Sequence, residues 1–197
     1  MLRAEGLALS RGGVPLLADL SFAVLPGEAL ILTGPNGTGK TTLLRALAGL
    51  LPPDGGRIER PETLAYAGHL DGVKPALTVA ENLRVWARLH GARNLGPALA
   101  AMDLEALRDR RGADLSAGQK RRVGLARLVV TGAPLWLLDE PTVSLDAASV
   151  RRFEAMLARH LEGGGAAVVA THLPVPGRVL DLAAFRAPLP EPEDLDW

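Results

Sequence analysis

The sequence has no cysteine among its 197 residues. Disulfide bonds, thiolate metal sites and cysteine nucleophiles are therefore excluded, and a bacterial cytosolic setting fits. Aromatic residues make up only 4% of the chain, and the formal net charge is +0. A balanced charge provides no strong field that would steer the protein to nucleic acid or anionic lipid, although it is compatible with a local basic patch.

A long uncharged apolar run is also missing. A membrane-spanning helix needs about 20 apolar residues, whereas the longest uncharged stretch, between Glu162 and Arg178, contains three consecutive glycines and two prolines. Residues 1–5 carry no apolar signal region. We therefore expect residues 1–197 to form one soluble, cytoplasmic domain. In a membrane process it would act as a peripheral subunit on the inner face of the bacterial cell membrane.

Short apolar runs alternate with longer helical patterns, which indicates an α/β fold. The most apolar runs predict buried strands at residues 29–33, 135–138 and 166–170. Residues 41–48 have a helical pattern that should end at Gly49. A second helix is expected around residues 150–161, where apolar side chains recur every three or four positions, and the glycines at 163–165 should terminate it.

The middle of the chain, residues 69–115, has a different character. Thr78 and Glu81 have the spacing of a capping box. The residues after them form an apolar stripe: Leu83, Trp86 and Leu89. Gly96-Pro97 then breaks the pattern before a second helical stretch around residues 99–107. We interpret this region as a small helical insert.

The α/β core is then expected from residues 1–68 and 116–197, on either side of the insert. The tail after Leu173 is expected to carry little regular structure. It contains five prolines: Pro174, Pro176, Pro188, Pro190 and Pro192. The sequence contains no internal repeat.

A glycine-rich loop directly follows the expected strand at 29–33. It matches the pattern G-x-x-x-x-G-K-[ST] with Gly34, Pro35, Asn36, Gly37, Thr38, Gly39, Lys40 and Thr41, and Thr42 follows. The backbone N–H groups of such a loop converge on phosphates, Lys40 adds positive charge, and the hydroxyl of Thr41 can bind Mg²⁺. A chance glycine-rich turn is the alternative, but the position between a strand and a helix argues against it. The loop predicts binding of a nucleoside triphosphate with Mg²⁺.

Two carboxylates follow the expected strand at 135–138. At the carboxyl end of a strand, Asp139 can reach Mg²⁺ directly or through water. Glu140 is placed differently and could accept a proton from an attacking water. Taken alone, the pair could equally be a polar strand terminus, but beside a phosphate-binding loop we interpret it as functional.

Residues 115–119 read Leu-Ser-Ala-Gly-Gln. Ser116 and Gln119 by themselves have the spacing of a capping box that opens a helix reaching about Val130. The order of this segment, the phosphate loop and the acidic strand end resembles the ABC ATPase family. The segment is similar to the family signature Leu-Ser-Gly-Gly-Gln, with Gly118 as the second glycine and alanine in place of the first.

Two further segments agree with this resemblance, which extends from about residue 7 to residue 172. Residues 144–146 are similar to the family's D-loop, and His172 stands where the family places its switch histidine. The resemblance implies a P-loop NTPase of the ABC ATPase fold, with a mixed sheet core. It also implies that Ser116, Gly118, Gln119 and Asp146 take part in nucleotide binding and that His172 contacts the γ-phosphate.

Two positions depart from the family pattern. Where the family usually places an aromatic residue that stacks on adenine, the sequence has Arg11, and where it places the glutamine of the Q-loop, which approaches Mg²⁺, the sequence has His69. The surrounding motifs, Gly68-His69, Gly72-Val73-Lys74 and residues 77–83, look like those of the haem-exporter ATPases of cytochrome c maturation. The resemblance to that group implies a role in haem export or in releasing a haem–chaperone complex.

The resemblance further implies a homodimer in the ATP-bound state, with ATP between the phosphate loop of one subunit and the signature helix of the other. Lys40 and Mg²⁺ would neutralise phosphate charge, Glu140 would polarise water, and His172 would hold the γ-phosphate in line. Closure would be passed to an integral membrane permease through the insert near His69.

Two alternatives within the same family stay open at this point: the ATPase of another small ABC transporter, and a non-transport ABC ATPase that acts on nucleic acid. The second usually has long inserts or two cassettes in one chain, so we expect no direct nucleic acid partner. A P-loop kinase or GTPase would lack the Ser116 segment. No pair of histidines has obvious haem-ligand spacing, so partners would handle any haem.

Overall fold

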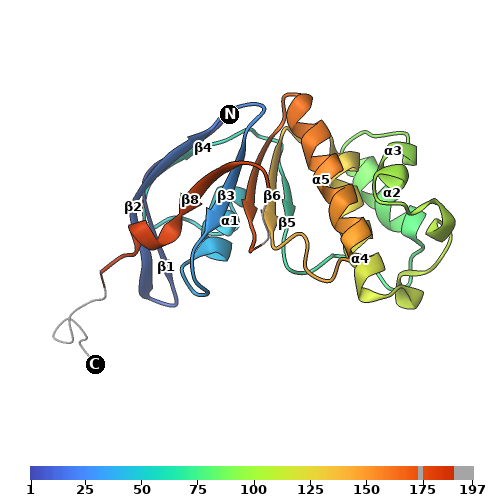
Figure 1. Cartoon of the computed structure of the whole chain (residues 1–197), viewed down its shortest axis with the longest axis horizontal. Coiled ribbons are helices and arrows are strands. Elements are labelled where there is room, and N and C mark those ends of the chain that lie inside the picture. The colour runs from blue at the N-terminus through green and yellow to red at the C-terminus, as the bar shows by residue number, and fades with distance from the viewer. Residues whose placement is uncertain (173–174, 189–197) are drawn as a thin grey trace.

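The computed structural model describes residues 1–172 and 175–188, and they form two sheets flanked by helices (Figure 1). The first sheet is antiparallel, in the order β2-β1-β4, with bounds β1 (Leu2–Arg11), β2 (Val14–Val24) and β4 (Gly55–Glu59). The second is parallel, in the order β5-β6-β7-β3-β8. Its strands are β3 (Ala29–Thr33), β5 (Ala65–Ala67), β6 (Leu135–Asp139), β7 (Ala166–Ala170) and β8 (Arg178–Asp181). Antiparallel pairing thus occurs in the first sheet and parallel pairing in the second.

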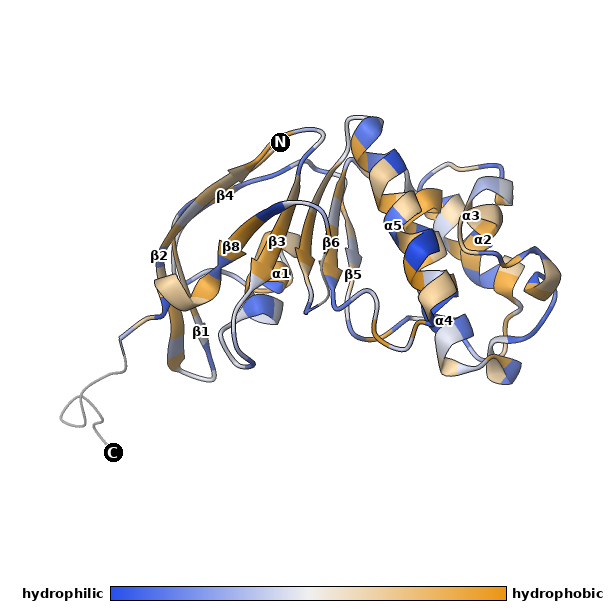
Figure 2. Ribbon diagram, in the orientation of Figure 1, coloured by the Kyte–Doolittle hydropathy of each residue, from blue (hydrophilic) through white to orange (hydrophobic). Residues whose placement is uncertain are grey.

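Strands β3, β6 and β7 are buried on both faces of the parallel sheet, which explains why they are continuous apolar runs. In β3, Leu30 and Leu32 point toward α1 (Lys40–Ala48) and the antiparallel sheet, while Ile31 points to the opposite face. That opposite face is covered by α4 (Ala117–Thr131) and α5 (Ala147–Glu162). Figure 2 shows the hydrophobic residues concentrated along these strands.

Three predicted helix ends are confirmed. Gly49 closes α1 in the left-handed conformation, as expected of a glycine C-cap. Ser116 caps α4 and Thr78 caps α2 (Val79–Leu89), each with a complete capping box. The strands predicted at 29–33, 135–138 and 166–170 are all present.

Two expectations for the insert are wrong in detail. Leu89 is 71% exposed and Trp86 is only partly buried, so neither belongs to the buried side of α2. That side consists of Val79, Ala80, Asn82, Leu83 and Ala87. The second helical stretch is α3 (Gly96–Ala101), which begins at Gly96 because proline is favourable in the first turn. It ends before Asp103, whose φ of 53° leaves the helical region. Two short 3₁₀ helices follow: η1 (Glu105–Leu107) and η2 (Gly112–Asp114).

The tail after Leu173 was expected to carry little regular structure, and this is also wrong. Strand β8 pairs in parallel with β3, and η3 (Leu182–Phe185) follows it. Pro176 and Pro188 lie outside these elements, so they do not remove any hydrogen bond from the ladder. Pro174, Pro190 and Pro192 lie outside the described residues. Within residues 1–172 and 175–188, no helix has the length and apolar character needed to cross a bilayer.

The tail therefore contributes to the core. Leu182 is fully buried among residues of β1, β2 and β3, whereas Val179 in β8 is 62% exposed. Leu182→Ala should lower the free energy of unfolding by about 2–5 kcal/mol because it leaves a cavity. Val179→Ala, the matched control, should change it by less than about 0.5 kcal/mol. Urea unfolding followed by circular dichroism measures both; equal small losses would mean that the tail does not stabilise the core.

Candidate functional site

The loop between β3 and α1 has the backbone geometry of a phosphate-binding loop. Gly34, Gly37 and Gly39 have φ angles of 132°, 84° and 101°, which only glycine adopts without strain. At Gly34 space is short as well, because a Cβ atom would lie 3.0 Å from the Thr38 hydroxyl oxygen. These glycines therefore permit the tight curvature that lets the backbone N–H groups converge.

Lys40, the first residue of α1, is held within this loop. Its ammonium Nζ donates to the carbonyl oxygens of Gly34 at 2.7 Å and Pro35 at 3.2 Å. The hydroxyl of Thr38 donates to the same Pro35 carbonyl. The mostly buried ammonium thus lies beside the N-terminus of α1, where the helix dipole also favours an anion.

A cavity of about 400 Å³ adjoins the loop, and nine of the predicted site residues line it. Its lining consists of Arg11, Leu16, Asn36, Gly37, Gly39, Lys40, Thr41, Thr42, Asp139 and Glu140. Arg11 is the last residue of β1, so the antiparallel sheet supplies one wall and the parallel sheet the other. The arrangement places a guanidinium, an ammonium and two carboxylates around one space.

Asp139 and Glu140 lie side by side in sequence but differ in environment. Asp139 ends β6 and is buried, whereas Glu140 is only partly buried and has a φ of 47°. The backbone N–H of Glu140 donates to the carbonyl of Ala170 at 2.8 Å. This bond ties the turn to the end of β7, from which His172 follows. The Nε2 atom of His172 lies 3.4 Å from the Oε1 atom of Glu140.

The metal ligands predicted from the sequence are brought together only in part. Thr41 and Asp139 both line the cavity, while His69 is exposed in the segment after β5 and is not among the lining residues that the structure describes. The described residues also contain no cluster of three or more histidine or acidic side chains that could hold a metal ion. One hydroxyl and one carboxylate are nevertheless a fitting set for Mg²⁺, which takes its other ligands from phosphates and water.

The Ser116 segment lies away from this cavity. The Oγ atom of Ser116 accepts from the backbone N–H of Gln119 at 3.2 Å, and the Oε1 atom of Gln119 accepts from that of Ser116 at 2.9 Å. Within the described part of the chain, neither these residues nor Gly118 and Asp146 line the cavity beside the phosphate loop. Ser116 is exposed at the N-terminus of α4.

Gly118 and Asp146 join this helix to the following turn. A Cβ atom on Gly118 would lie 2.8 Å from the carbonyl oxygen of Ser144, so only glycine permits the contact. Asp146 caps α5 by accepting from the backbone N–H of Ser149 at 2.7 Å, and this hydrogen bond lowers the pKa of its carboxyl group. The D-loop residues therefore lie against the N-terminus of α4 within one subunit.

Sequence reasoning missed Arg121, which is buried in α4 and donates to the backbone of Asp139 and Glu140. One signal was available. Arg121 lies four residues before Leu125 and seven before Leu128, both fully buried, so a charged residue occupies the apolar stripe of the helix. Such a residue requires a buried partner.

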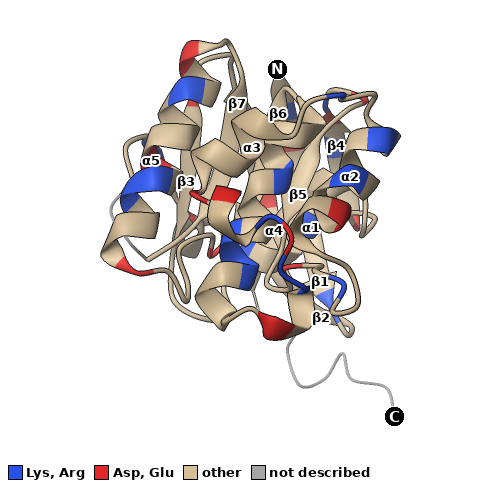
Figure 3. Ribbon diagram, turned by 90° about the vertical axis from the view of Figure 1, so that its right-hand side faces the viewer, with Lys and Arg blue, Asp and Glu red and all other residues tan. Residues whose placement is uncertain are grey.

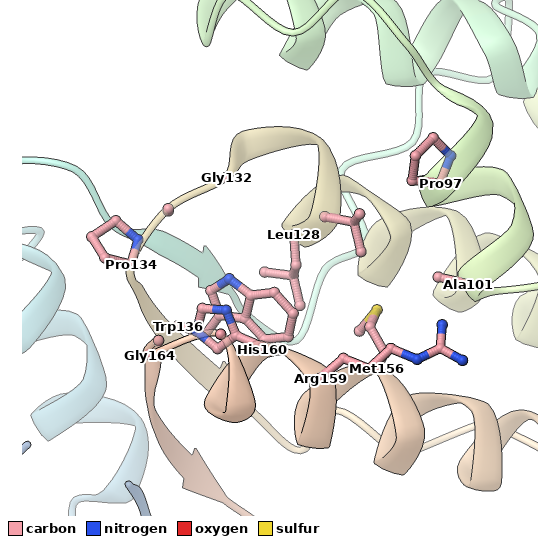
Figure 4. Close-up of a pocket in the computed structure, with 14 residues that line it drawn as sticks. Pro97, Ala101, Leu128, Gly132, Pro134, Trp136, Met156, Arg159, His160 and Gly164 are labelled. Atoms are coloured by element: carbon pink, nitrogen blue, oxygen red, sulfur yellow. The ribbon is translucent and has the colours of Figure 1, made fainter. Parts of the chain in front are cut away.

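A larger cavity, of about 490 Å³, lies at the amino ends of strands β6 and β7, whereas the phosphate loop follows the carboxyl end of β3 (Figure 4). The ring of Trp136 stacks on that of His160, with centroids 3.7 Å apart, and burial lowers the pKa of His160. None of the predicted site residues is among the lining residues that the structure describes. The phosphate loop and the larger cavity are therefore separate features.

Comparisons with known proteins agree with the site's geometry. The model of the ABC transporter family matches residues 17–143. The chain is 56% identical, over 97% of its length and 91% of the relative, to the "Cytochrome c biogenesis ATP-binding export protein CcmA" of Rhodobacter capsulatus. The protein of the same name from Paracoccus denitrificans is 57% identical, over 95% of this chain and 91% of the relative.

Among solved structures, one entitled "Structure of ATP binding subunit of ABC transporter" superposes with a TM-score of 0.81 at 26% identity. The match covers 88% of this chain and 80% of that structure. The α/β fold predicted from the sequence is thereby confirmed as that of an ABC ATPase. The chain belongs to the ABC transporter family and, within it, to the cytochrome c biogenesis ATP-binding export proteins.

Proposed function

We propose that this chain binds and hydrolyses ATP as a subunit of an ABC complex in cytochrome c biogenesis, and that hydrolysis drives haem export or release of a haem–chaperone complex. The observation that carries the ATPase function is the cavity in which Lys40 and Thr41 face Asp139 and Glu140. The high identity to relatives named for cytochrome c biogenesis supports the biological process. These relatives do not favour another small transporter or an ATPase acting on nucleic acid.

The charge distribution is consistent with the absence of nucleic acid from the proposal. Figure 3 shows basic and acidic residues both distributed over the end of the molecule that carries α2, α3 and α4. A nucleic-acid interface would instead gather Lys and Arg on one face.

In the proposed site, the backbone of residues 34–39 and the ammonium of Lys40 bind the phosphates of ATP. Thr41 and Asp139 would hold Mg²⁺, which neutralises charge on the phosphate oxygens. Arg11 extends from the antiparallel sheet into the same cavity and can lay its planar guanidinium on the adenine ring. Thr42 completes the lining at the start of α1.

Glu140 is the proposed general base. Its carboxylate lies at the edge of the cavity next to the phosphate loop, where it can accept a proton from the attacking water. His172 approaches the Oε1 atom of Glu140 to 3.4 Å, so the two side chains can orient one water between them and the γ-phosphate. The water attacks phosphorus, the bond to the bridging oxygen breaks, and ADP and inorganic phosphate leave.

Each chain would carry half of each working site. Ser116 is exposed away from its own cavity, at a helix N-terminus that favours anions. In a two-fold dimer the Ser116 ends can each close on ATP held by the other subunit's phosphate loop, so that two sites form at once. Gly118, Gln119 and Asp146 would shape this second half of the site.

We place the chain on the inner face of the bacterial cell membrane, bound to an integral membrane permease through residues 69–115. The exposed His69 and Leu70 lie on this segment, close in sequence to the buried strand β5. Opening and closing of the dimer would reach the permease by this route.

The first prediction for the proposed site concerns Glu140. Glu140→Gln keeps the shape of the side chain but removes the base, so turnover should fall by about 100-fold or more while ATP still binds. The trapped ATP should also hold the dimer together in size-exclusion chromatography. Glu62→Gln, on an exposed loop residue, is the control and should retain full activity. Unchanged turnover in Glu140→Gln would remove Glu140 from its role.

The second prediction concerns Arg11. Loss of a stacked guanidinium in Arg11→Ala should weaken ATP binding by about fivefold to thirtyfold, the equivalent of roughly 1–2 kcal/mol. Fluorescence titration with an ATP analogue measures the affinity. Arg57→Ala, which removes an exposed arginine on β4, should leave it unchanged. An equal affinity in Arg11→Ala and the native protein would exclude stacking.

The third prediction concerns His69, which lies outside the nucleotide cavity. His69→Gln should leave ATP affinity within about twofold of the native value, since the residue does not line the site. It should instead change how strongly the membrane partner alters the ATPase rate in the assembled complex. Abolished ATP binding would show that His69 belongs to the nucleotide site and not to the segment that connects the ATPase to the permease.

A further inference from the structure

The buried guanidinium of Arg121 binds two segments that are far apart in sequence. Arg121 is 5% exposed, and all five of its N–H groups have acceptors. Nε donates to the carbonyl of Pro141 at 3.1 Å, and Nη2 donates to those of Asp139 at 3.1 Å and Glu140 at 2.6 Å. Nη1 donates to the carbonyl of Gly68 at 2.9 Å and to Oδ1 of Asp71 at 3.0 Å.

Three of these acceptors are consecutive carbonyls of the turn after β6. Glu140, in the middle, has a φ of 47°, a conformation that is strained for a non-glycine residue and persists only when its surroundings enforce it. The guanidinium of Arg121 donates to the backbone carbonyl of Glu140, and the backbone N–H of Glu140 donates to the carbonyl of Ala170. Both peptide groups that flank the Glu140 side chain are therefore held in place. The direction of the Glu140 side chain therefore depends on Arg121.

The other two acceptors lie in the segment Gly68–Asp71, which is packed closely on α4. A Cβ atom on Gly124 would lie 3.1 Å from the carbonyl oxygen of Asp71, so the helix backbone approaches the segment directly. Arg127 donates to that same carbonyl at 3.3 Å and to the carbonyl of Tyr66 at 2.9 Å. Next to this tightly held Asp71, Leu70 is 83% exposed.

We propose that Arg121 is a positioning residue that makes the orientation of Glu140 depend on the segment Gly68–Asp71. A partner that displaces Leu70 moves Asp71, and the guanidinium transmits the displacement to the turn that carries Glu140. Arg121 is not among the described residues that line the nucleotide cavity; it acts through the backbone of Glu140. The proposal rests on the proposed role of Glu140 as the general base.

A purely structural role for Arg121 makes a different prediction. If the guanidinium only stabilised the fold, its loss would lower the melting temperature while leaving kcat unchanged in the protein that remains folded. If it positions Glu140, kcat falls while ATP affinity is retained, because the phosphate loop has no contact with Arg121 among the hydrogen bonds of the described residues.

The test compares four variants of the full chain at a temperature well below their melting points. Arg121→Gln should lower kcat by about tenfold or more, since small misplacements of a reacting group are costly, while the Kd for ATP stays within about threefold. Arg121→Lys supplies fewer donors and should fall between Arg121→Gln and the native protein. Asp71→Asn keeps the Oδ1 acceptor but loses the charge, so it should reduce kcat only mildly, and Asp71→Ala should reduce it more.

The matched control is Arg122→Gln, on the neighbouring residue of the same helix. Arg122 donates to the carbonyls of Met102 and Asp103, so its loss removes the same charge and a comparable anchor without touching the turn at Glu140. Its kcat should stay within about twofold of the native value. If Arg121→Gln fails to fold, the two Asp71 variants test the proposal instead: a lower kcat in Asp71→Ala with retained ATP affinity supports it, and a native kcat overturns it.

The outcomes separate this inference from the proposed function. If Glu140→Gln is inactive but Arg121→Gln and Asp71→Ala retain native kcat, the positioning role is wrong and the role of Glu140 stands. If Glu140→Gln is itself active, the proposed base is wrong. A double variant Arg121→Gln/Asp71→Ala that loses no more activity than Arg121→Gln alone supports a single linkage; fully additive losses overturn it.

Discussion

The parallel register of three neighbouring strands is the constraint on which the candidate site depends. Strand β7 pairs with β3 on one side and β6 on the other, and Ala170 is level with both Leu32 and Asp139. The chain segments that leave these strands therefore emerge at one edge of the sheet, as is usual for ligand sites in parallel sheets. They carry the phosphate loop, the Asp139–Glu140 pair and His172. A shift of one residue in this register would separate groups that, in the proposed mechanism, act on the same phosphate.

The same edge of the sheet contains groups whose backbone conformation or burial disfavours the folded state. Glu140 has a positive φ, the phosphate loop requires three glycines with positive φ, and Arg121 brings a guanidinium into the core. These features are compensated by the strands β3, β6 and β7, which are buried on both faces, with α1 on one side and α4 and α5 on the other. Helix α4 has two functions in this account: its N-terminus presents Ser116 outward, and one turn later Arg121 holds the turn behind Glu140.

Much of this arrangement could be predicted from sequence because the signals are local. A strand, a glycine-rich loop and a helix in succession predict the phosphate site, and both capping boxes are confirmed. Strand β8 could not be predicted in this way, because flanking prolines conceal a short strand that pairs with β3, which is far away in the sequence. Arg121 was missed for a related reason: four of its five acceptors are backbone carbonyls, which no side-chain pattern reveals. His69 was expected near the metal from its sequence position alone, and the structure places it outside the cavity.

The central claim is that the two halves of the ATP site come from different subunits, and cross-linking tests it most directly. Since the chain has no native cysteine, Asn36→Cys in the phosphate loop and Ala117→Cys next to Ser116 can be introduced into separate Glu140→Gln subunits. The two kinds of subunit are then mixed and treated with a short bismaleimide. The account predicts a cross-linked dimer that forms with ATP and Mg²⁺ and disappears without nucleotide. A nucleotide-bound dimer that never links residue 36 to residue 117 would contradict it.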